Sequence, residues 1–199
     1  MADRAGIVVA DRARLPARST GLNPRAASAR CPRPRRSRWA ARGCDAQGGE
    51  LGAPLDAVYL ARHGWRVAAV DLVDRAVRQA RKKADAAGVD VTVLCGDATR
   101  LDEVGVPGPY DLFFDLSCYC GIPPHRRDAY AAGLTTRAAP GAQLLMFGYG
   151  PEAFDDPISC VTADELRARF AGWQLTDVTP GTNPVPTFWF TLHRAAVAA

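Results

Sequence analysis

The chain has 199 residues, 48% of them hydrophobic, which suits one globular domain with some additional sequence. Residues 1–42 contain eleven Arg and two Asp, a net charge of +9, whereas the whole chain carries +4. The remaining residues therefore carry −5. The basic isoelectric point belongs to the N-terminal segment and does not indicate a nucleic-acid-binding fold, so we do not expect a nucleic-acid partner for the domain.

The chain contains no run of about 18 apolar residues, so we expect no transmembrane helix. No apolar segment follows Arg35-Arg36 to complete an export signal. Without such a signal, the six cysteines are best interpreted as reduced thiols in a cytoplasmic protein. The Cys118-x-Cys120 pair lacks a second pair and a histidine at ligand spacing, so we expect no metal site there.

Residues 1–54 differ in amino-acid composition and hydrophobic pattern from residues 55–199, which we interpret as the folded domain. They are rich in Arg, Ala, Pro and Gly, and only Gly6 to Ala10 looks like a strand. Three interpretations stay open: a disordered tail, a basic arm attracted to nucleic acid or anionic surfaces, or a mistranslated segment. A GC-rich gene read in the wrong frame gives this bias, and mass-spectrometric detection of peptides from residues 1–50 would decide the last interpretation.

From residue 55 onward, helical and strand patterns alternate. Residues 55–63 read as a helix ended by Gly64, residues 65–71 as a buried strand ending in Asp71, and residues 74–87 as a helix capped by Asp74. A second strand covers residues 91–96, and a third covers residues 110–116 and is apolar on both faces apart from Asp111 and Asp115.

The second half continues the alternation and then changes pattern. Pro123-Pro124 opens a helix to about residue 138, and the Pro140-Gly141 turn precedes a strand over residues 142–148. Thr162 to Glu165 forms a capping box. The β-rich runs 173–178 and 187–193 have no helix between them, so they should pair antiparallel. The sequence thus predicts a Rossmann-like, doubly wound, mostly parallel α/β sheet that ends in an antiparallel strand pair.

The order of these strands, helices and motifs resembles that of the class I S-adenosylmethionine-dependent methyltransferases, especially the bacterial type that acts on small molecules. The resemblance covers about residues 55–199. It rests on AVYLARHGWRVAAVDLVDRAVRQARKKA, VTVLCGDATRL, YDLFFDLSCYCGIPPHRRDAY and QLLMFGYGP, followed by the terminal strand pair. It implies S-adenosyl-L-methionine as cofactor and a small molecule as methyl acceptor.

The resemblance also implies a set of site residues. Asp71 would accept hydrogen bonds from the ribose hydroxyls, because a carboxylate can accept from two vicinal hydroxyls at once and ligands bind at the carboxyl ends of parallel strands. Leu72 would lie against the adenine, and the turn at Asp97 and Ala98 would contact its amino group. Leu116 and Ser117 end the strand that passes under the methionine half. His125 is a candidate base or acceptor-orienting group; otherwise it is a polar residue of a first helical turn.

One part of the chain departs from the pattern. The resemblance implies a strand ending in an acid, then a Gly-x-Gly-x-Gly loop, just before residue 55. That loop falls on GGELGAP, where Gly52 matches while Glu50 and Pro54 replace two glycines. Residues 40–47 make a poor buried strand, so the first and central strand is poorly defined. The strand-like Gly6 to Ala10 could substitute for it, although 44 residues separate it from Leu55.

Three other functions compete with methyl transfer. The altered loop favours a non-catalytic, Rossmann-like relic. An NAD-dependent oxidoreductase needs an intact glycine fingerprint and usually a Tyr-x-x-x-Lys pair, yet the only lysines, Lys82 and Lys83, lie on a solvated helix face. A basic-arm nucleic-acid binder would depend on residues 1–42.

Overall fold

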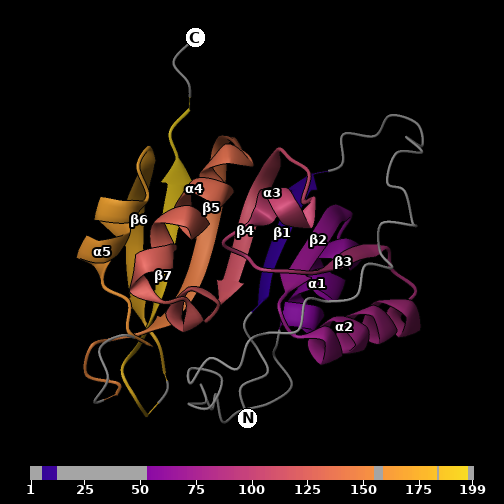
Figure 1. The fold of residues 1–199 in the computed structure, drawn as a ribbon, viewed down its shortest axis with the longest axis horizontal. Helices are drawn as coiled ribbons and strands as arrows, with labels where there is room; N and C mark the ends of the chain where they lie inside the picture. The colour runs from indigo at the N-terminus through magenta and orange to yellow at the C-terminus, as the bar shows by residue number, and fades with distance from the viewer. Residues whose placement is uncertain (1–5, 13–52, 155–158, 183, 197–199) are drawn as a thin grey trace.

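The structure is a computed structural model, and it describes residues 6–12, 53–154, 159–182 and 184–196 (Figure 1). Seven strands form one sheet in the order β3-β2-β1-β4-β5-β7-β6. The strands are β1 (Gly6–Arg12), β2 (Trp65–Asp71), β3 (Val91–Cys95), β4 (Tyr110–Leu116), β5 (Ala138–Tyr149), β6 (Trp173–Pro180) and β7 (Thr187–Arg194). The α-helices are α1 (Ala53–Arg62), α2 (Asp74–Ala87), α3 (Leu101–Val104), α4 (Arg127–Thr136) and α5 (Ala163–Arg169), and two 3-10 turns are η3 (Tyr119–Gly121) and η4 (Pro124–Arg126).

The predicted fold class is confirmed. The pairs β2–β3 and β4–β5 are parallel, and the final pair β6–β7 is antiparallel. Strands β2 and β4 have the predicted bounds because their apolar runs are long and end in turn residues. Helix α2 ends as predicted at Gly88, which adopts the left-handed conformation that a side chain would disfavour.

Two local predictions are corrected. Pro140-Gly141 does not precede β5 but lies inside it, where Gly141 has φ +78° and the strand continues on both sides. The N-cap of α2 is Val73, without a side-chain cap, whereas Asp74 pairs with Arg78 one turn later. The carboxylate at Asp71 accepts the Val73 N–H at 2.7 Å instead. The strand-end acid therefore takes over part of the capping role.

The central strand is β1, which comes from residues 1–54, the segment that we predicted to lie outside the folded domain. It lies between β2 and β4 and runs antiparallel to both, with Gly6 opposite Asp71 and Arg12 opposite Trp65. Residues Ile7 to Ala10 are fully buried. The unpaired edges that β2 and β4 would otherwise present to each other are thus satisfied. Because β1 is reversed, its end at Arg12 lies at the edge opposite Asp71, so the expected short connection from strand end to glycine loop to α1 is not formed.

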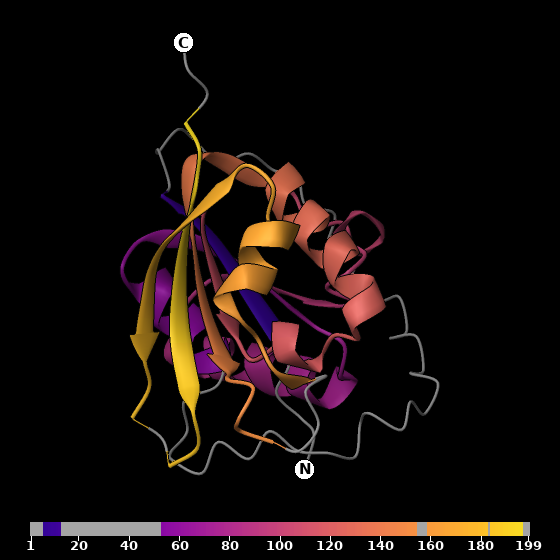
Figure 2. The ribbon, with the colours of Figure 1, turned by 90° about the vertical axis from the view of Figure 1, so that its left-hand side faces the viewer.

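The helices form a layer on each face of the sheet. One core cluster joins the sheet to α1 and α2 and consists of Val and Ala side chains, among them Val8, Val67, Ala69 and Val77. The other joins the sheet to α3, α4 and α5 and contains most of the aromatic residues. Figure 2 shows α4 and α5 together on one side of the sheet.

The cysteines within the described residues divide into two groups. Cys118, Cys120 and Cys160 are buried free thiols, as predicted for reduced cysteines. Cys95 is disulfide-bonded, so the expectation of reduced thiols is wrong for that residue. Among the described residues, no helix is long and apolar enough to cross a membrane.

Candidate functional site at the carboxyl edge of the sheet

The predicted site residues gather along one edge of the sheet. Strands β2, β3, β4 and β5 run in the same direction, because β2 and β4 are both antiparallel to β1 and each has a parallel neighbour. Their carboxyl ends share the edge at which the β4 arrow ends in Figure 1. In open α/β sheets this is the edge where ligands bind, since the loops that follow the strands are free to form a crevice.

At the end of β2, Asp71 and Leu72 form the first part of the site. One carboxylate oxygen of Asp71 accepts the N–H of Val73, and the Asp71 carbonyl accepts the N–H of Gly96 at 3.0 Å. The second bond holds the ends of β2 and β3 together. Leu72 exposes 38% of its surface at this edge, which leaves an apolar face open next to a carboxylate.

At the end of β3, the turn at Asp97 and Ala98 forms the second part. One Asp97 oxygen accepts from the N–H of Thr99 at 2.9 Å and from its hydroxyl at 2.8 Å, and the other pairs with Arg126 at 2.5 Å. Burial alone would raise the pKa of Asp97, but the hydrogen bonds from Arg126 and Thr99 outweigh it and lower that pKa. Asp97 is therefore ionised at neutral pH, and Arg126 links this turn to η4, which follows β4 in the chain.

At the end of β4, a buried carboxylate organises the chain around Leu116 and Ser117. Asp115 is fully buried and accepts the N–H of Cys118 at 2.6 Å, the N–H of Tyr119 at 3.1 Å and the hydroxyl of Tyr130 at 2.6 Å. Ser117 has φ +67°, a conformation that non-glycine residues rarely adopt, and its N–H continues the ladder to Phe147 of β5. The strained residue and the three hydrogen bonds turn the chain sharply away from the sheet.

The burial of Asp115 has an electrostatic consequence. Desolvation raises the pKa of this carboxyl group to about 6, against the lowering effect of the hydrogen bonds from Tyr130, Cys118 and Tyr119. The sequence shows Asp115 as one of two carboxylates in a strand that is otherwise apolar on both faces, but we predicted no role for it in the site. That pattern is the signal that could have identified the buried carboxylate.

Beyond β5, aromatic side chains continue the same edge. Tyr149 is buried at the last position of β5, and its ring lies 4.9 Å from that of Phe154, which is 36% exposed. His125 is exposed on η4, between the end of β4 and α4. The edge thus combines acids at β2 and β3 with aromatic residues at β5. The predicted Gly52 lies outside the described residues.

The comparisons with known proteins agree with this geometry. The thiopurine S-methyltransferase (TPMT) family model matches residues 51–182. A thiopurine S-methyltransferase of Pseudomonas entomophila is 30% identical over 145 residues, which cover 64% of this chain and 65% of that enzyme. A 2-heptyl-1-hydroxyquinolin-4(1H)-one methyltransferase of Mycobacteroides abscessus is 26% identical over 65% of this chain and 58% of its own length. The chain thus spans somewhat less than two thirds of both relatives.

Solved structures share the fold. A protein whose structure was described for the conversion of a disulfide bond into a thioacetal group during echinomycin biosynthesis has a TM-score of 0.61 and 24% identity, covering 72% of both chains. The magnesium protoporphyrin IX methyltransferase of Synechocystis PCC 6803, solved with bound S-adenosylmethionine, has a TM-score of 0.56 and 17% identity, covering 69% of this chain and 64% of that one. The match to the family model covers more than half of the chain, so this chain belongs to the thiopurine S-methyltransferase family, as the resemblance to class I methyltransferases predicted.

Proposed function

We propose that this protein transfers a methyl group from S-adenosyl-L-methionine to a small-molecule acceptor. The observation that carries the proposal is the placement of Asp71, Asp97 and Ser117 after the carboxyl ends of β2, β3 and β4, along one edge of the sheet, in a chain of this family. The alternative is a relic of the fold that no longer binds cofactor, and titration calorimetry with S-adenosyl-L-methionine separates the two.

The residues present fit the adenosyl half of the cofactor. Asp71 supplies a carboxylate for two vicinal hydroxyls, and the exposed Leu72 beside it supplies an apolar surface for a planar base. Asp97 is ionised and suits an amino group, although Arg126 and Thr99 already occupy its oxygens, so we expect Arg126 to shift when the base is bound. Ala98, Leu116 and the predicted Gly52 complete the proposed set.

The cofactor supplies an activated sulfonium methyl, so the task of the protein is mainly to align the acceptor and exclude water. Positioning of this kind contributes on the order of 7 to 11 kcal/mol at best. In this chain, Asp115 performs part of that task from within the core, because it fixes the turn at Ser117 and Cys118. His125 stays a proposed base for acceptors that must lose a proton before attack.

The acceptor that we propose is a heteroaromatic molecule. The names of the two relatives above specify a thiopurine and a hydroxyquinolinone, both planar rings. Phe154 is exposed beside the buried ring of Tyr149, to which it is tilted by 55°, and it offers a surface on which such a ring can pack. We also propose a cytoplasmic location. We propose a boundary near residue 55, after which the methyltransferase-like elements follow in order, with Gly6–Arg12 of the segment 1–54 as the central strand of the same sheet.

Titration calorimetry with S-adenosyl-L-methionine tests the proposed function. We expect binding by the unmodified chain and at least about tenfold weaker binding by Asp71→Ala, since a hydrogen bond to a charged group contributes about 1.5 to 3 kcal/mol. Asp85→Ala, which removes an exposed carboxylate on α2, is the matched control and should bind as the unmodified chain does. No heat from folded, unmodified protein at millimolar ligand would instead support the relic.

A further inference from the structure

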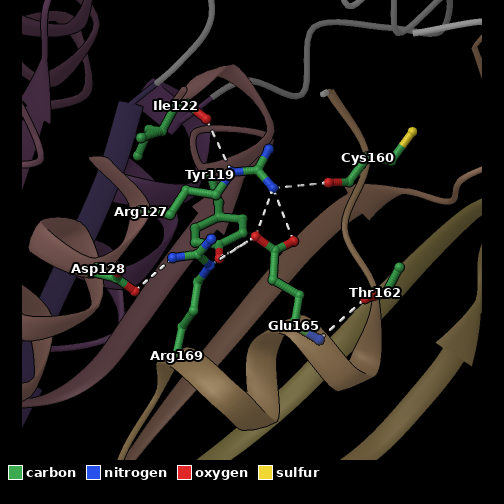
Figure 3. Close-up of polar contacts among 8 residues, drawn as sticks. All are labelled: Tyr119, Ile122, Arg127, Asp128, Cys160, Thr162, Glu165 and Arg169. Carbon is green, nitrogen blue, oxygen red and sulfur yellow. Dashed lines mark hydrogen bonds and ion pairs between the residues drawn. The ribbon is translucent and has the colours of Figure 1, made fainter. Parts of the chain in front are cut away.

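Two side chains from different helices meet near the carboxyl ends of β4 and β5, which is the side of the site where we propose that the acceptor binds. Arg127 is the first residue of α4, which follows β4, and Glu165 lies in the first turn of α5, which follows β5. Their ion pair measures 2.9 Å, and the Arg127 side chain is only 3% exposed (Figure 3). The pair therefore bridges the two segments that leave the carboxyl ends of adjacent parallel strands.

The contacts of Arg127 reach both segments. Its Nε donates to the carbonyl of Ile122 at 3.0 Å, on the β4 side. One terminal nitrogen donates to the carbonyl of Cys160 at 3.1 Å and to both Glu165 oxygens, on the β5 side. Its guanidinium carbon lies 4.7 Å from the centre of the Tyr119 ring. A planar guanidinium can satisfy these acceptors together, whereas a lysine ammonium is a point charge and cannot.

Glu165 collects donors from three elements. It accepts from Arg127, from Arg169 at 2.9 Å and from the Tyr119 hydroxyl at 3.2 Å, and Arg169 in turn pairs with Asp128 of α4 at 2.6 Å (Figure 3). A carboxylate suits the start of α5, but a buried cation at the start of α4 gains nothing from the helix dipole. Burying Arg127 therefore depends on these specific acceptors.

The bridged segments pack on each other behind the predicted acceptor surface. The N–H of Val161, next to Cys160, donates to the carbonyl of Tyr149 at 2.8 Å. A side chain added at Gly148 would meet Val161 at 3.0 Å and the sulfur of Cys120 at 3.4 Å. The buried thiols of Cys120 and Cys160 thus lie on the two sides that Arg127 joins.

We propose that Arg127 is a positioning residue, which locks the Cys118–Ile122 turn to the Cys160–Glu165 segment and so fixes the acceptor side of the site. We call this connection between the two segments the lock. The inference about the acceptor rests on the proposed methyl transfer, whereas the existence of the lock does not depend on it. Arg127 need not touch the acceptor, since it acts through the two segments that carry Tyr119 and lead back to Tyr149.

The experiment compares Arg127→Lys with Arg137→Lys. Arg137 is a matched control because it is also buried, flanks the same helix and donates to carbonyls, those of Val106 and Gly133, while pairing with Asp102. It lies at the opposite edge, where its carbonyl accepts the N–H of Tyr110 at the start of β4. Both substitutions keep a positive charge and remove the guanidinium fork.

The first measurement is the rate at which iodoacetamide labels each buried cysteine in the full chain, resolved by peptide mass spectrometry. In Arg127→Lys we expect Cys120 and Cys160 to react about tenfold faster than in the unmodified chain, because the local opening of the two segments becomes easier. In Arg137→Lys their rates should stay within about twofold of the unmodified chain. Equal rates in the two variants would overturn the lock.

The second measurement uses 6-mercaptopurine as a thiol acceptor probe. We expect Arg127→Lys to raise the KM for this acceptor about tenfold, with the Kd for S-adenosyl-L-methionine within about twofold. An unchanged acceptor KM together with faster cysteine labelling would overturn the acceptor part of the proposal. If the unmodified chain binds no cofactor, the proposed function fails, and cysteine labelling still decides the lock.

A milder variant guards against misfolding of Arg127→Lys. Glu165→Gln keeps the side-chain volume at a position that is 20% exposed and weakens the same ion pair. It should accelerate labelling of Cys120 and Cys160 in the same direction, by a smaller factor. Labelling no faster than in the unmodified chain would contradict the lock.

Discussion

The two faces of the sheet are packed with different types of residue. Among the described residues, the buried core under α1 and α2 contains only Val and Ala, whereas the core under α3, α4 and α5 contains Phe, Tyr, Trp, Leu and Met. The polar groups differ as well. The aromatic face buries Asp115, Arg127 and Arg137 with their partners. The face of small residues has no buried charged residue in the part of the chain that the structure describes.

This difference shows how the two parts of the site are supported. Each small side chain buries little area, and burial contributes about 0.8 kcal/mol per CH₂ group, so the α1/α2 face depends on close backbone packing through β1. The aromatic face gains more from each residue and can offset the cost of buried ion pairs. The proposed ribose contact thus depends on a strand from the far N-terminus, whereas the proposed acceptor side depends on buried polar side chains such as Asp115 and Arg127 and on their partners.

The largest expected effect comes from breaking the small-residue face. Val8 is fully buried in β1 between β2 and β4, so Val8→Asp places an unpaired charge in the core. We expect a loss of about 4 kcal/mol or more in the free energy of unfolding, measured by urea denaturation.

Asp11→Asn in the same strand is the control. It removes an ion pair with the exposed Arg66, and should cost about 1 kcal/mol or less. If both variants unfold at the same urea concentration as the unmodified chain, β1 does not hold the centre of the sheet.

A second effect tests the buried carboxylate of the aromatic face. The pKa of Asp115 is about 6 in the folded protein, above its ordinary value of 3.8, so the folded state binds its proton more tightly than the unfolded state. The stability that this group contributes is therefore fully present below about pH 4 and is lost as the pH rises through 6. A shift of this size corresponds to about 3 kcal/mol.

Urea unfolding between pH 4 and pH 7.5 measures this dependence as the difference between the unmodified chain and Asp115→Asn. Subtracting the variant removes the titration of the other carboxylates, Asp97 included, whose lowered pKa acts in the opposite direction. A difference that does not change with pH would show that Asp115 is not buried as a titrating group.

The smallest effect concerns the start of α5. The Thr162 hydroxyl accepts the N–H of Glu165 at 3.1 Å, so Thr162→Ala should lower the free energy of unfolding by about 1 kcal/mol. Thr162→Ser keeps the acceptor and should retain most of the stability. If Ser and Ala destabilise equally, the contribution comes from packing of the threonine methyl group rather than from the cap.

Helix α5 also shows which features can be predicted from the sequence and which cannot. The capping box at Thr162 and Glu165 predicted the start of α5, because a cap is a local hydrogen bond. The carboxylate of Glu165, however, accepts from Arg127, Arg169 and Tyr119, which lie between four and 46 residues away in the chain. The hydrophobic periodicity of a sequence cannot identify partners that lie so far apart in the chain.

The sequence by itself determined the strands and helices after residue 55, the acids at the ends of β2 and β3, and the terminal antiparallel pair. These features follow from short-range patterns: apolar runs, turn residues and caps. Only the tertiary structure decided that Gly6–Arg12 fills the centre of the sheet in the reversed direction, because both directions bury the same four apolar residues. It also decided that Asp115 and Arg127 are buried, since that depends on which distant groups surround a charge.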